Sequence, residues 1–149
     1  NWCYNEPWLT AANNNLLTYP AKPKPAYYAV KEALRPALPS ARIPKFDWNG
    51  GELFTAELWY LNDSPDTVSD VVEVSIAVSG EETFLLEWKV DDVAPRTNKI
   101  GPSVNFKLPS KASRNEIKLI LRSAQGRDSA YTLLFRHGEK PVFTNEINN

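Results

Sequence analysis

The sequence has no methionine, one cysteine and one histidine among its 149 residues. A single cysteine, Cys3, forms no internal disulfide, and Cys3 with His137 does not supply the four ligands of a structural zinc site. The sequence therefore predicts no disulfide framework, no metal site and no other cofactor. Because methionine is absent, we expect the chain to be a processed product or a piece of a longer protein.

Long apolar runs and concentrated positive charge are also missing. No run approaches the roughly 20 apolar residues that cross a bilayer, and no signal-peptide pattern opens the chain. The 17 basic and 18 acidic residues leave a net charge of −1, and the basic ones are scattered along the sequence. A nucleic-acid-binding protein concentrates positive charge on one face. The sequence thus predicts neither a membrane nor a nucleic acid as a partner.

The first part of the chain, residues 1–36, is rich in Trp, Tyr, Asn and Pro and contains one predicted helix, residues 26–35. Pro25 suits the first position of this helix, where its missing N–H is not needed, and Pro36 ends it. Apolar side chains recur at helical spacing on one face: Tyr27, Val30 and Leu34. Residues 13–15 and 19–23 are predicted to be loops, and residues 2–4 the end of a buried strand. One short helix and one strand need a partner surface to cover them.

From about residue 40 the apolar period changes to two, which is typical of half-buried strands. The predicted inward-facing residues are Phe54, Ala56, Leu58, Tyr60, Val72, Val74, Ile76, Val78, Phe84, Leu86, Trp88, Ile117, Leu119, Leu121, Tyr131, Leu133 and Phe135. Turn-forming residues interrupt them at 49–51, 62–65, 80–82 and 125–128. With residues 42–46 and 104–108, about seven strands are expected. Residues 37–149 are therefore predicted to be an immunoglobulin-like antiparallel β-sandwich with its own core.

Two segments of the first part resemble a known enzyme family. Residues 2–8, Trp-Cys-Tyr-Asn-Glu-Pro-Trp, resemble the Trp-x-x-Asn-Asp/Glu-x-Trp segment of family 2 glycoside hydrolases, the β-mannosidase, β-galactosidase and β-glucuronidase group. Residues 19–31 are similar to that family's Asp-Tyr-x-Gly-x-x-Lys-x-x-Tyr-Tyr stretch, which leads into its last barrel helix. Thr18 stands where the family often has Asp, and Ala21 where it often has Gly. In the family a β-sandwich follows directly.

The resemblance implies that residues 1–36 are the last strand and helix of a (β/α)8 TIM-barrel catalytic domain and that residues 37–149 are a C-terminal accessory domain. The upstream barrel of the same polypeptide is then the partner, and a carbohydrate is the substrate of the parent enzyme. Retaining glycosidases use two carboxylates, which in this family come from earlier barrel strands. The chain itself is therefore expected to hold no catalytic residue. Many bacterial members are exported, which implies a secreted or periplasmic protein.

The resemblance also assigns substrate-binding residues, because active sites of such barrels lie at the C-terminal ends of the strands. Trp2 is the strongest candidate, with its ring stacked on the sugar next to the scissile bond. Asn5, Glu6 and Trp8 are expected on the rim, where Glu6 forms hydrogen bonds because no second carboxylate lies near it in the motif. Core packing is the alternative for both tryptophans.

The sandwich itself leaves other functions open. Trp48, Trp59 and Trp88 raise the possibility of a carbohydrate-binding module that stacks aromatic rings on sugars. Trp88 is in phase with the predicted core, whereas Trp59 is out of phase, so Trp59 is a candidate for sugar stacking or for interdomain packing. A linker or adhesion domain without a ligand is the third alternative.

Other polar patterns in the sandwich are interpreted as structural. The acidic neighbours at 81–82 and 91–92 point to opposite faces of a strand and do not converge on one proton. The calcium-like spacing over residues 62–66 lacks the glycine and glutamate of an EF-hand loop and is interpreted as a turn. No nucleophile-elbow sequence accompanies Ser123, Ser129 or His137.

Overall fold

Ten strands and one helix lie within residues 15–18 and 20–136, the part of the chain that the computed structural model describes. The protein is mainly β. The described residues up to Pro36 and those from Ala37 onward form two separate units. The division falls close to the residue at which the apolar period changes from helical to alternating.

The first unit contains a β-hairpin of two short strands that the apolar periodicity does not predict. Strand β1 (Leu17–Thr18) pairs antiparallel with β2 (Lys22–Pro23), and β2 lies within residues 19–23, which were predicted to be loop. The Ala21 N–H donates to the Thr18 carbonyl at 2.6 Å, and the Thr18 hydroxyl donates to the Lys22 carbonyl at 3.2 Å. Local hydrogen bonds of this kind leave no apolar periodicity in the sequence.

Helix α1 (Pro25–Ala33) follows, with proline in its first turn as predicted. It ends two residues before the predicted boundary, because the residue before Pro36 is biased out of the helical conformation. No residue of α1 is buried. Tyr27 is half-buried, whereas Tyr28, Val30 and Leu34, the residue after the helix, have exposed fractions of 57%, 36% and 76%.

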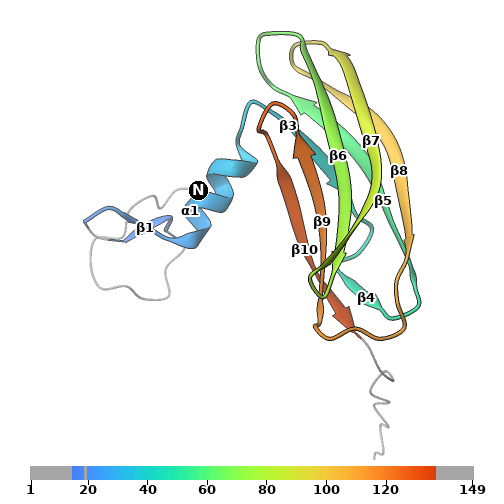
Figure 1. Cartoon of the computed structure of the whole chain (residues 1–149). Coiled ribbons are helices and arrows are strands. Elements are labelled where there is room, and N and C mark those ends of the chain that lie inside the picture. The colour runs from blue at the N-terminus through green and yellow to red at the C-terminus, as the bar shows by residue number, and fades with distance from the viewer. Residues whose placement is uncertain (1–14, 19, 137–149) are drawn as a thin grey trace, which may run out of the picture. The chain divides into compact units, whose positions relative to one another are not determined.

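The second unit is the predicted β-sandwich. Its strands are β3 (Ala37–Arg42), β4 (Asp47–Asn49), β5 (Leu53–Asn62), β6 (Val68–Val78), β7 (Glu81–Val93), β8 (Thr97–Lys107), β9 (Glu116–Ser123) and β10 (Ser129–Arg136). A five-stranded sheet has the order β4-β10-β9-β6-β7, and a three-stranded sheet has the order β3-β5-β8. Figure 1 shows β6 and β7 running along the length of the sandwich.

The chain moves repeatedly from one sheet to the other. Only the β6–β7 and β9–β10 connections stay within a sheet. Ser79 and Gly80 form the β6–β7 turn with φ of 55° and 94°, the conformation that tight hairpin turns require. One prediction is wrong here: the strand expected over residues 42–46 lies instead at 37–42. Strand β4, which the sequence did not predict, pairs with β10 in parallel, whereas the other strand pairs of the two sheets are antiparallel.

The core lies between the two sheets and consists of the inward side chains of both. All but three of the predicted inward residues are buried, and two of those three, Leu86 and Tyr131, pack partly buried against the core. Trp88 is buried as predicted, with its ring edge-on to Tyr60 at a centroid distance of 6.5 Å. Gly101 allows the approach of this ring, because a Cβ there would lie 2.5 Å from it.

Phe84 is the predicted core residue that the structure places outside. The β6–β7 pairing shifts by one residue between Val74 and Ser75, so that Val74 faces Leu86 and Ser75 faces Phe84. This bulge reverses the alternation, and the Phe84 side chain is 59% exposed. Residues 81–82, predicted as part of the turn, belong to β7.

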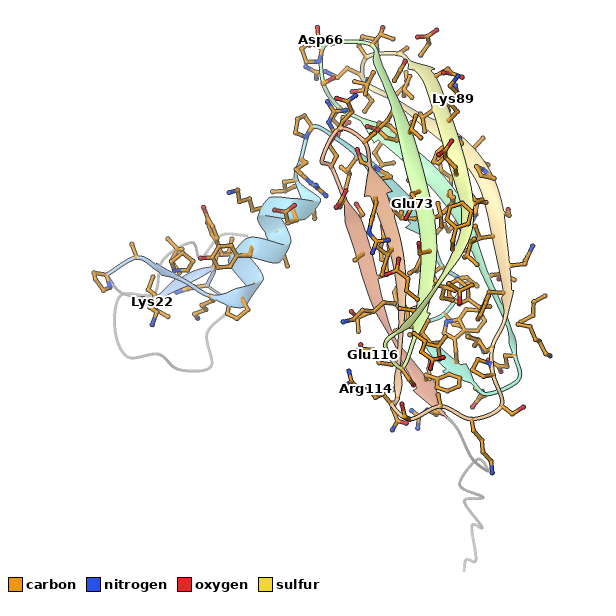
Figure 2. The ribbon with its side chains drawn as sticks, in the orientation of Figure 1. Lys22, Asp66, Glu73, Lys89, Arg114 and Glu116 are labelled. Carbon is orange, nitrogen blue, oxygen red and sulfur yellow. The ribbon has the colours of Figure 1, made fainter. Side chains whose placement is uncertain are left out.

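Asn62 organises the end of the sandwich at which two connections cross between the sheets. Its buried amide group donates to the carbonyls of Asp66, Val93 and Ala94, at 2.9–3.1 Å. Its carbonyl oxygen accepts from the Ser64 N–H and hydroxyl. The interpretation of residues 62–66 as a turn is confirmed. Figure 2 places Asp66 at this end of the sandwich and Arg114 and Glu116 at the opposite end.

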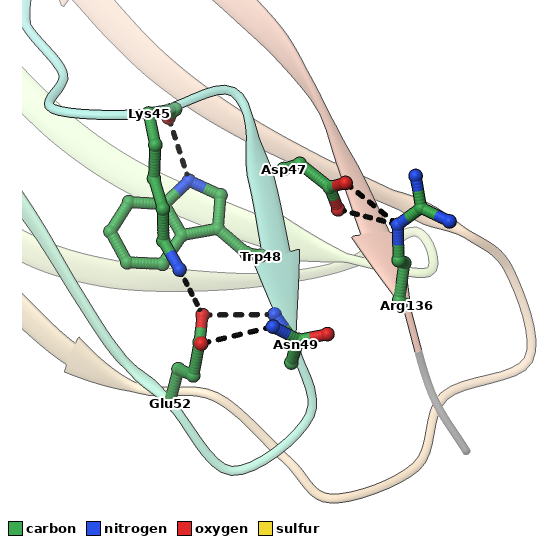
Figure 3. Close-up of polar contacts among 6 residues, drawn as sticks. All are labelled: Lys45, Asp47, Trp48, Asn49, Glu52 and Arg136. Atoms are coloured by element: carbon green, nitrogen blue, oxygen red, sulfur yellow. Dashed lines mark hydrogen bonds and ion pairs between the residues drawn. The ribbon is translucent and has the colours of Figure 1, made fainter. Parts of the chain in front are cut away.

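A polar cluster surrounds the β4–β5 turn (Figure 3). The Glu52 carboxylate accepts from Lys45 Nζ at 2.5 Å and from the backbone and side-chain N–H groups of Asn49, each at 3.0 Å. The indole N–H of Trp48 donates to the Lys45 carbonyl, and Lys45 Nζ lies 4.5 Å from the centroid of that ring. These bonds hold the pKa of the Glu52 carboxyl at about 2, with the Lys45 bond as the largest cause.

The parallel strand pair at this turn has its own ion pair. Arg136 Nε donates to both carboxylate oxygens of Asp47, at 2.8 and 2.7 Å (Figure 3). Gly50 lies against the loop that follows β8, where a Cβ would come within 2.3 Å of the Ser110 carbonyl oxygen. Position 50 is therefore restricted to glycine.

The depressed pKa of Glu52 makes stability dependent on pH. A carboxyl with a lowered folded-state pKa stabilises the protein above its unfolded pKa of about 4.3, and this stabilisation is lost as the pH falls toward about 2. We expect Glu52→Gln to lower the free energy of unfolding by about 1 kcal/mol at pH 7, since partial exposure reduces the effect. Urea denaturation should show this difference shrinking below pH 4. Glu81→Gln, at an exposed position of β7, is the control, and an equal loss from Glu52→Gln at pH 7 and pH 2.5 would contradict the assignment.

Candidate functional site

The four residues predicted to line the end of a barrel, Trp2, Asn5, Glu6 and Trp8, lie outside the described residues, as do Cys3 and His137. Their roles stay predictions. Of the predicted site residues, Trp59 of the sandwich lies within the described part of the chain.

Trp59 lies on the outer face of the three-stranded sheet, as its phase in the sequence predicts. The residues that alternate with the core in β5 face outward, and strand pairing brings further side chains beside them. Trp59 pairs with Ser40 of β3 and with Ile100 of β8. One step along the same face, Glu57 pairs with Arg42 and Ser103, and the next step pairs Thr55 with Asn105.

The indole ring of Trp59 is held by its neighbour on the same face. Its Nε1–H donates to Glu57 Oε2 at 2.8 Å, and the same carboxylate oxygen lies 3.7 Å from Arg42 Nη1. The ring is half-buried, and Ile100 beside it is 57% exposed. Since the one polar atom of the indole is bonded, the part of the ring that meets solvent is apolar carbon.

An open hollow of about 570 Å³ lies on the same face, one step along β5 from Trp59. Its lining is Arg42, Ile43, Pro44, Thr55, Ala56, Glu57, Ser103 and Asn105. The volume is within the range of small-molecule sites, which is roughly 300–1,000 Å³. The hollow therefore combines hydroxyl and amide groups with one ion pair, and Glu57 connects it to the Trp59 ring.

The other two tryptophans of the sandwich are core residues. Trp48 is buried against Phe54, with a ring-centroid distance of 4.9 Å, and Trp88 is buried between Tyr60 and Gly101. Among the three tryptophans considered for sugar stacking, Trp59 alone has part of its side chain in solvent.

Most carboxylates of the described residues are exposed. Asp70 is the single buried acidic residue among them, and no group of three or more His, Cys, Asp or Glu side chains gathers there. Asp92 is exposed and bonded to Ser69, and Glu82 binds Arg122 on the outer face of the five-stranded sheet. That ion pair holds the pKa of Glu82 at about 2, so Glu82 is an anion rather than a proton donor at neutral pH.

Asp70 is instead the centre of a structural network. Its Oδ2 accepts from the Tyr60 hydroxyl at 2.9 Å and from the Ser123 hydroxyl at 2.5 Å, and its Oδ1 accepts from the Val71 N–H at 2.7 Å. Arg127 Nη1 donates to the Tyr60 oxygen at 3.0 Å. Burial raises the pKa of Tyr60, which keeps its hydroxyl protonated as a donor. The network joins the three-stranded sheet to β6 and to the end of β9.

Known proteins resemble this chain in fold, but no match assigns it to a family. No protein-family model matches the chain, and no curated protein matches it. The chain is similar to the CARDB domain of the PF1109 protein from Pyrococcus furiosus, solved in complex with di-metal ions, with a TM-score of 0.52, 14% identity and coverage of 68% of this chain and 94% of that one. It is also similar to the alkylpurine DNA glycosylase AlkC of Pseudomonas fluorescens, solved bound to DNA containing an abasic site analogue, with a TM-score of 0.50, 11% identity and coverage of 68% and 30%. A β-glucosidase from Listeria innocua in complex with glucose matches with a TM-score of 0.47, 13% identity and coverage of 68% and 16%.

The two packed sheets define the second unit as a β-sandwich domain, and the similarity to the CARDB domain agrees with that fold. The chain spans nearly the whole of the CARDB domain but less than a third of the glycosylase and of the glucosidase. At identities of 11–14% the likeness is one of fold alone.

Within the described residues, no helix is long and apolar enough to cross a membrane.

The sequence predicts the outward position of Trp59 but not all of the residues around it. Thr55 and Glu57 share its alternation along β5, so the pattern alone was sufficient to place them on its face. Arg42, Ser103 and Asn105 come from other strands, and only the pairing register brings them there. No signal in the sequence specifies that register.

The structural role of Asp70 can be tested by substitution. We expect Asp70→Asn to lower the free energy of unfolding by about 2–3 kcal/mol, because charged hydrogen bonds are replaced and a buried donor is left without an acceptor. Urea denaturation measures the change. Asp66→Asn, at an exposed carboxylate near the same end, is the matched control and should stay within about 0.5 kcal/mol of the parent chain. Equal stabilities for the two variants would show that the network contributes nothing.

Proposed function

We propose that residues 37–149 are an accessory, non-catalytic β-sandwich domain of a retaining glycoside hydrolase similar to family 2. Residues 1–36 then belong to the last strand and helix of its catalytic barrel. The proposal originates in the resemblance of residues 2–8 and 19–31 to that family. The exposed apolar side chains of α1 are the structural observation that supports it most directly.

Helix α1 begins at Pro25, where the resemblance places the start of the last barrel helix. Val30 within it and Leu34 at its end are exposed, although together with the half-buried Tyr27 they have the spacing of one face of an amphipathic helix. Helices are stabilised mainly by burial of their apolar face, so a nine-residue helix with no buried residue needs another surface. The outer ring of a barrel offers such a surface.

The backbone at Ala21 gives independent support. Its φ of 127° is a conformation that glycine adopts readily and that a Cβ disfavours. The family often has glycine at this position. The backbone conformation at residue 21 is therefore one that the family's glycine would adopt without strain. Alanine adopts it here at a cost in backbone strain.

The arrangement of carboxylates in the sandwich agrees with an accessory role. Glycosidases need two carboxyl groups on either side of the scissile bond. The buried carboxylate of the described residues, Asp70, has its oxygens occupied by Tyr60, Ser123 and the Val71 N–H. Chemistry in the parent enzyme is thus assigned to the barrel.

The coding sequence upstream of Asn1 provides the first test. We expect it to encode a TIM barrel with two glutamates at the family positions, and a protein extended to include it should hydrolyse a nitrophenyl glycoside. The 149-residue chain alone should show no turnover. Hydrolysis by that chain that disappears in Glu6→Gln would contradict the proposal, as would an upstream sequence without a barrel.

The exposed end of α1 provides the second test, on the extended protein. We expect Leu34→Ala to change the stability of the 149-residue chain by less than about 0.5 kcal/mol, because Leu34 is exposed there. In the extended protein the same substitution should cost about 2 kcal/mol, since Leu34 would pack against the barrel. Thermal unfolding measures both, with the exposed Lys31→Ala as the matched control. An equally small effect of Leu34→Ala in the two proteins would argue against a barrel at this helix.

A further inference from the structure

We propose that the outer face of the β3-β5-β8 sheet binds a neutral oligosaccharide chain, with Trp59 as the stacking platform and the hollow one step along β5 as the site for sugar hydroxyls. This inference goes beyond an accessory role and does not depend on the proposed catalytic barrel. It follows from the ring, the hollow and the charges of this one face.

Trp59 has the properties of a stacking platform. An aromatic ring presents a large, rigid apolar surface, which suits the C–H face of a pyranose. The bond from its Nε1 to Glu57 fixes the orientation of the ring and satisfies its polar atom. Ile100, exposed directly across from it on β8, extends the apolar surface sideways.

The hollow supplies hydrogen-bonding groups that match sugar hydroxyls. Thr55 and Ser103 carry hydroxyls that donate and accept, and Asn105 carries an amide with both functions. Asn105 and Thr55 are direct cross-strand neighbours, so they offer their groups side by side. A sugar hydroxyl also donates and accepts, and this lining suits it without any charged contact.

The charges on the face favour a neutral ligand. Arg42 and Glu57 are the two charged residues that line the hollow, and they lie 3.7 Å apart as an ion pair. Their charges cancel within the hollow, so an anionic chain such as a polyuronate or a nucleic acid meets no net attraction there. Lys107, which pairs with Leu53 one step beyond Thr55, is an exposed cation on the same face but outside the hollow. Because the Glu57 carboxylate is paired with Arg42, the hollow offers no unpaired carboxylate to a cationic peptide.

The arrangement along β5 favours a chain of sugars over a single one. Thr55, Glu57 and Trp59 point to one face at every second residue, and each step of two residues spans roughly 6.8 Å. A ligand that contacts both Trp59 and Thr55 therefore extends over roughly 13 Å. That length corresponds to several linked sugars lying along the strand.

The competing occupant of this face is another domain of the same protein. Interfaces of that kind have an apolar centre, from which charged residues are depleted. Here the exposed apolar residues, Leu53 and Ile100, are separated by Glu57, Ser103 and Asn105. The interleaved polar groups favour a hydrophilic ligand over a packed domain.

The test is native affinity electrophoresis of the 149-residue chain in gels that contain soluble galactomannan, mixed-linkage β-glucan or xylan. We expect retardation by at least one of these polysaccharides and none by polygalacturonate. Trp59→Ala should weaken the binding at least tenfold, and Asn105→Ala, an exposed substitution that does not touch the ring, should weaken it several-fold. Circular dichroism and the urea midpoint confirm that each variant is folded.

Phe84→Ala is the matched control, because Phe84 is an exposed aromatic residue on the outer face of the opposite sheet. It should bind like the parent chain. The absence of retardation by all three neutral polysaccharides would overturn the inference, and so would equal losses in Trp59→Ala and Phe84→Ala. Unchanged polysaccharide binding in Trp59→Ala, together with lower stability of a longer protein that carries the upstream domain, would assign the face to interdomain packing instead.

Discussion

The sandwich depends on one buried carboxylate more than on any other polar group. Asp70 accepts hydrogen bonds from the hydroxyls of Tyr60 and Ser123, which belong to different sheets, and so it links the two layers. A carboxyl group in the core is tolerated only when its oxygens are hydrogen-bonded, and both are bonded here. Asn62 supports the same end by bonding three carbonyls of two crossing connections. Tyr131 of β10 adds a further polar link between the layers, because its hydroxyl is hydrogen-bonded to Ser40 Oγ at 2.9 Å and accepts from the Ala41 N–H of β3 at 3.1 Å.

The outward face of the three-stranded sheet is a consequence of the same packing. Strand β5 buries Phe54, Leu58 and Tyr60 against the opposite sheet, and the pleat turns every other residue away from the core. Trp59 stands on the outward side among polar neighbours, and its bond to Glu57 orients it there. Because the packed sandwich lies behind the ring, the proposed binding face is preorganised and need not rearrange when a ligand binds.

Much of the fold was predictable because its strands have one buried and one exposed face. Strict alternation located β5, β6, β9 and β10, and Gly, Asn, Asp and Pro located their turns. The prediction failed where pairing interrupts the pattern. Phe84 lies on the outside because a bulge in β6–β7 adds a residue, and β3 was misplaced because its buried residues are not spaced by two. The hairpin before α1 rests on local hydrogen bonds and has no apolar period at all.

By itself, the sequence determined which residues of β5, β6, β9 and β10 face the core, where α1 begins and that Trp59 points away from the interior. These properties depend on neighbours within a few positions, so composition and periodicity express them directly. Only the tertiary structure decided that Trp59 lies one step along β5 from a hollow lined by Ser103 and Asn105, and that Asp70 ends between Tyr60 and Ser123. Such partners lie far apart in the chain, and they meet through a pairing register that bulges and crossing connections set. That register is a property of the whole sandwich, and no segment of the sequence encodes it alone.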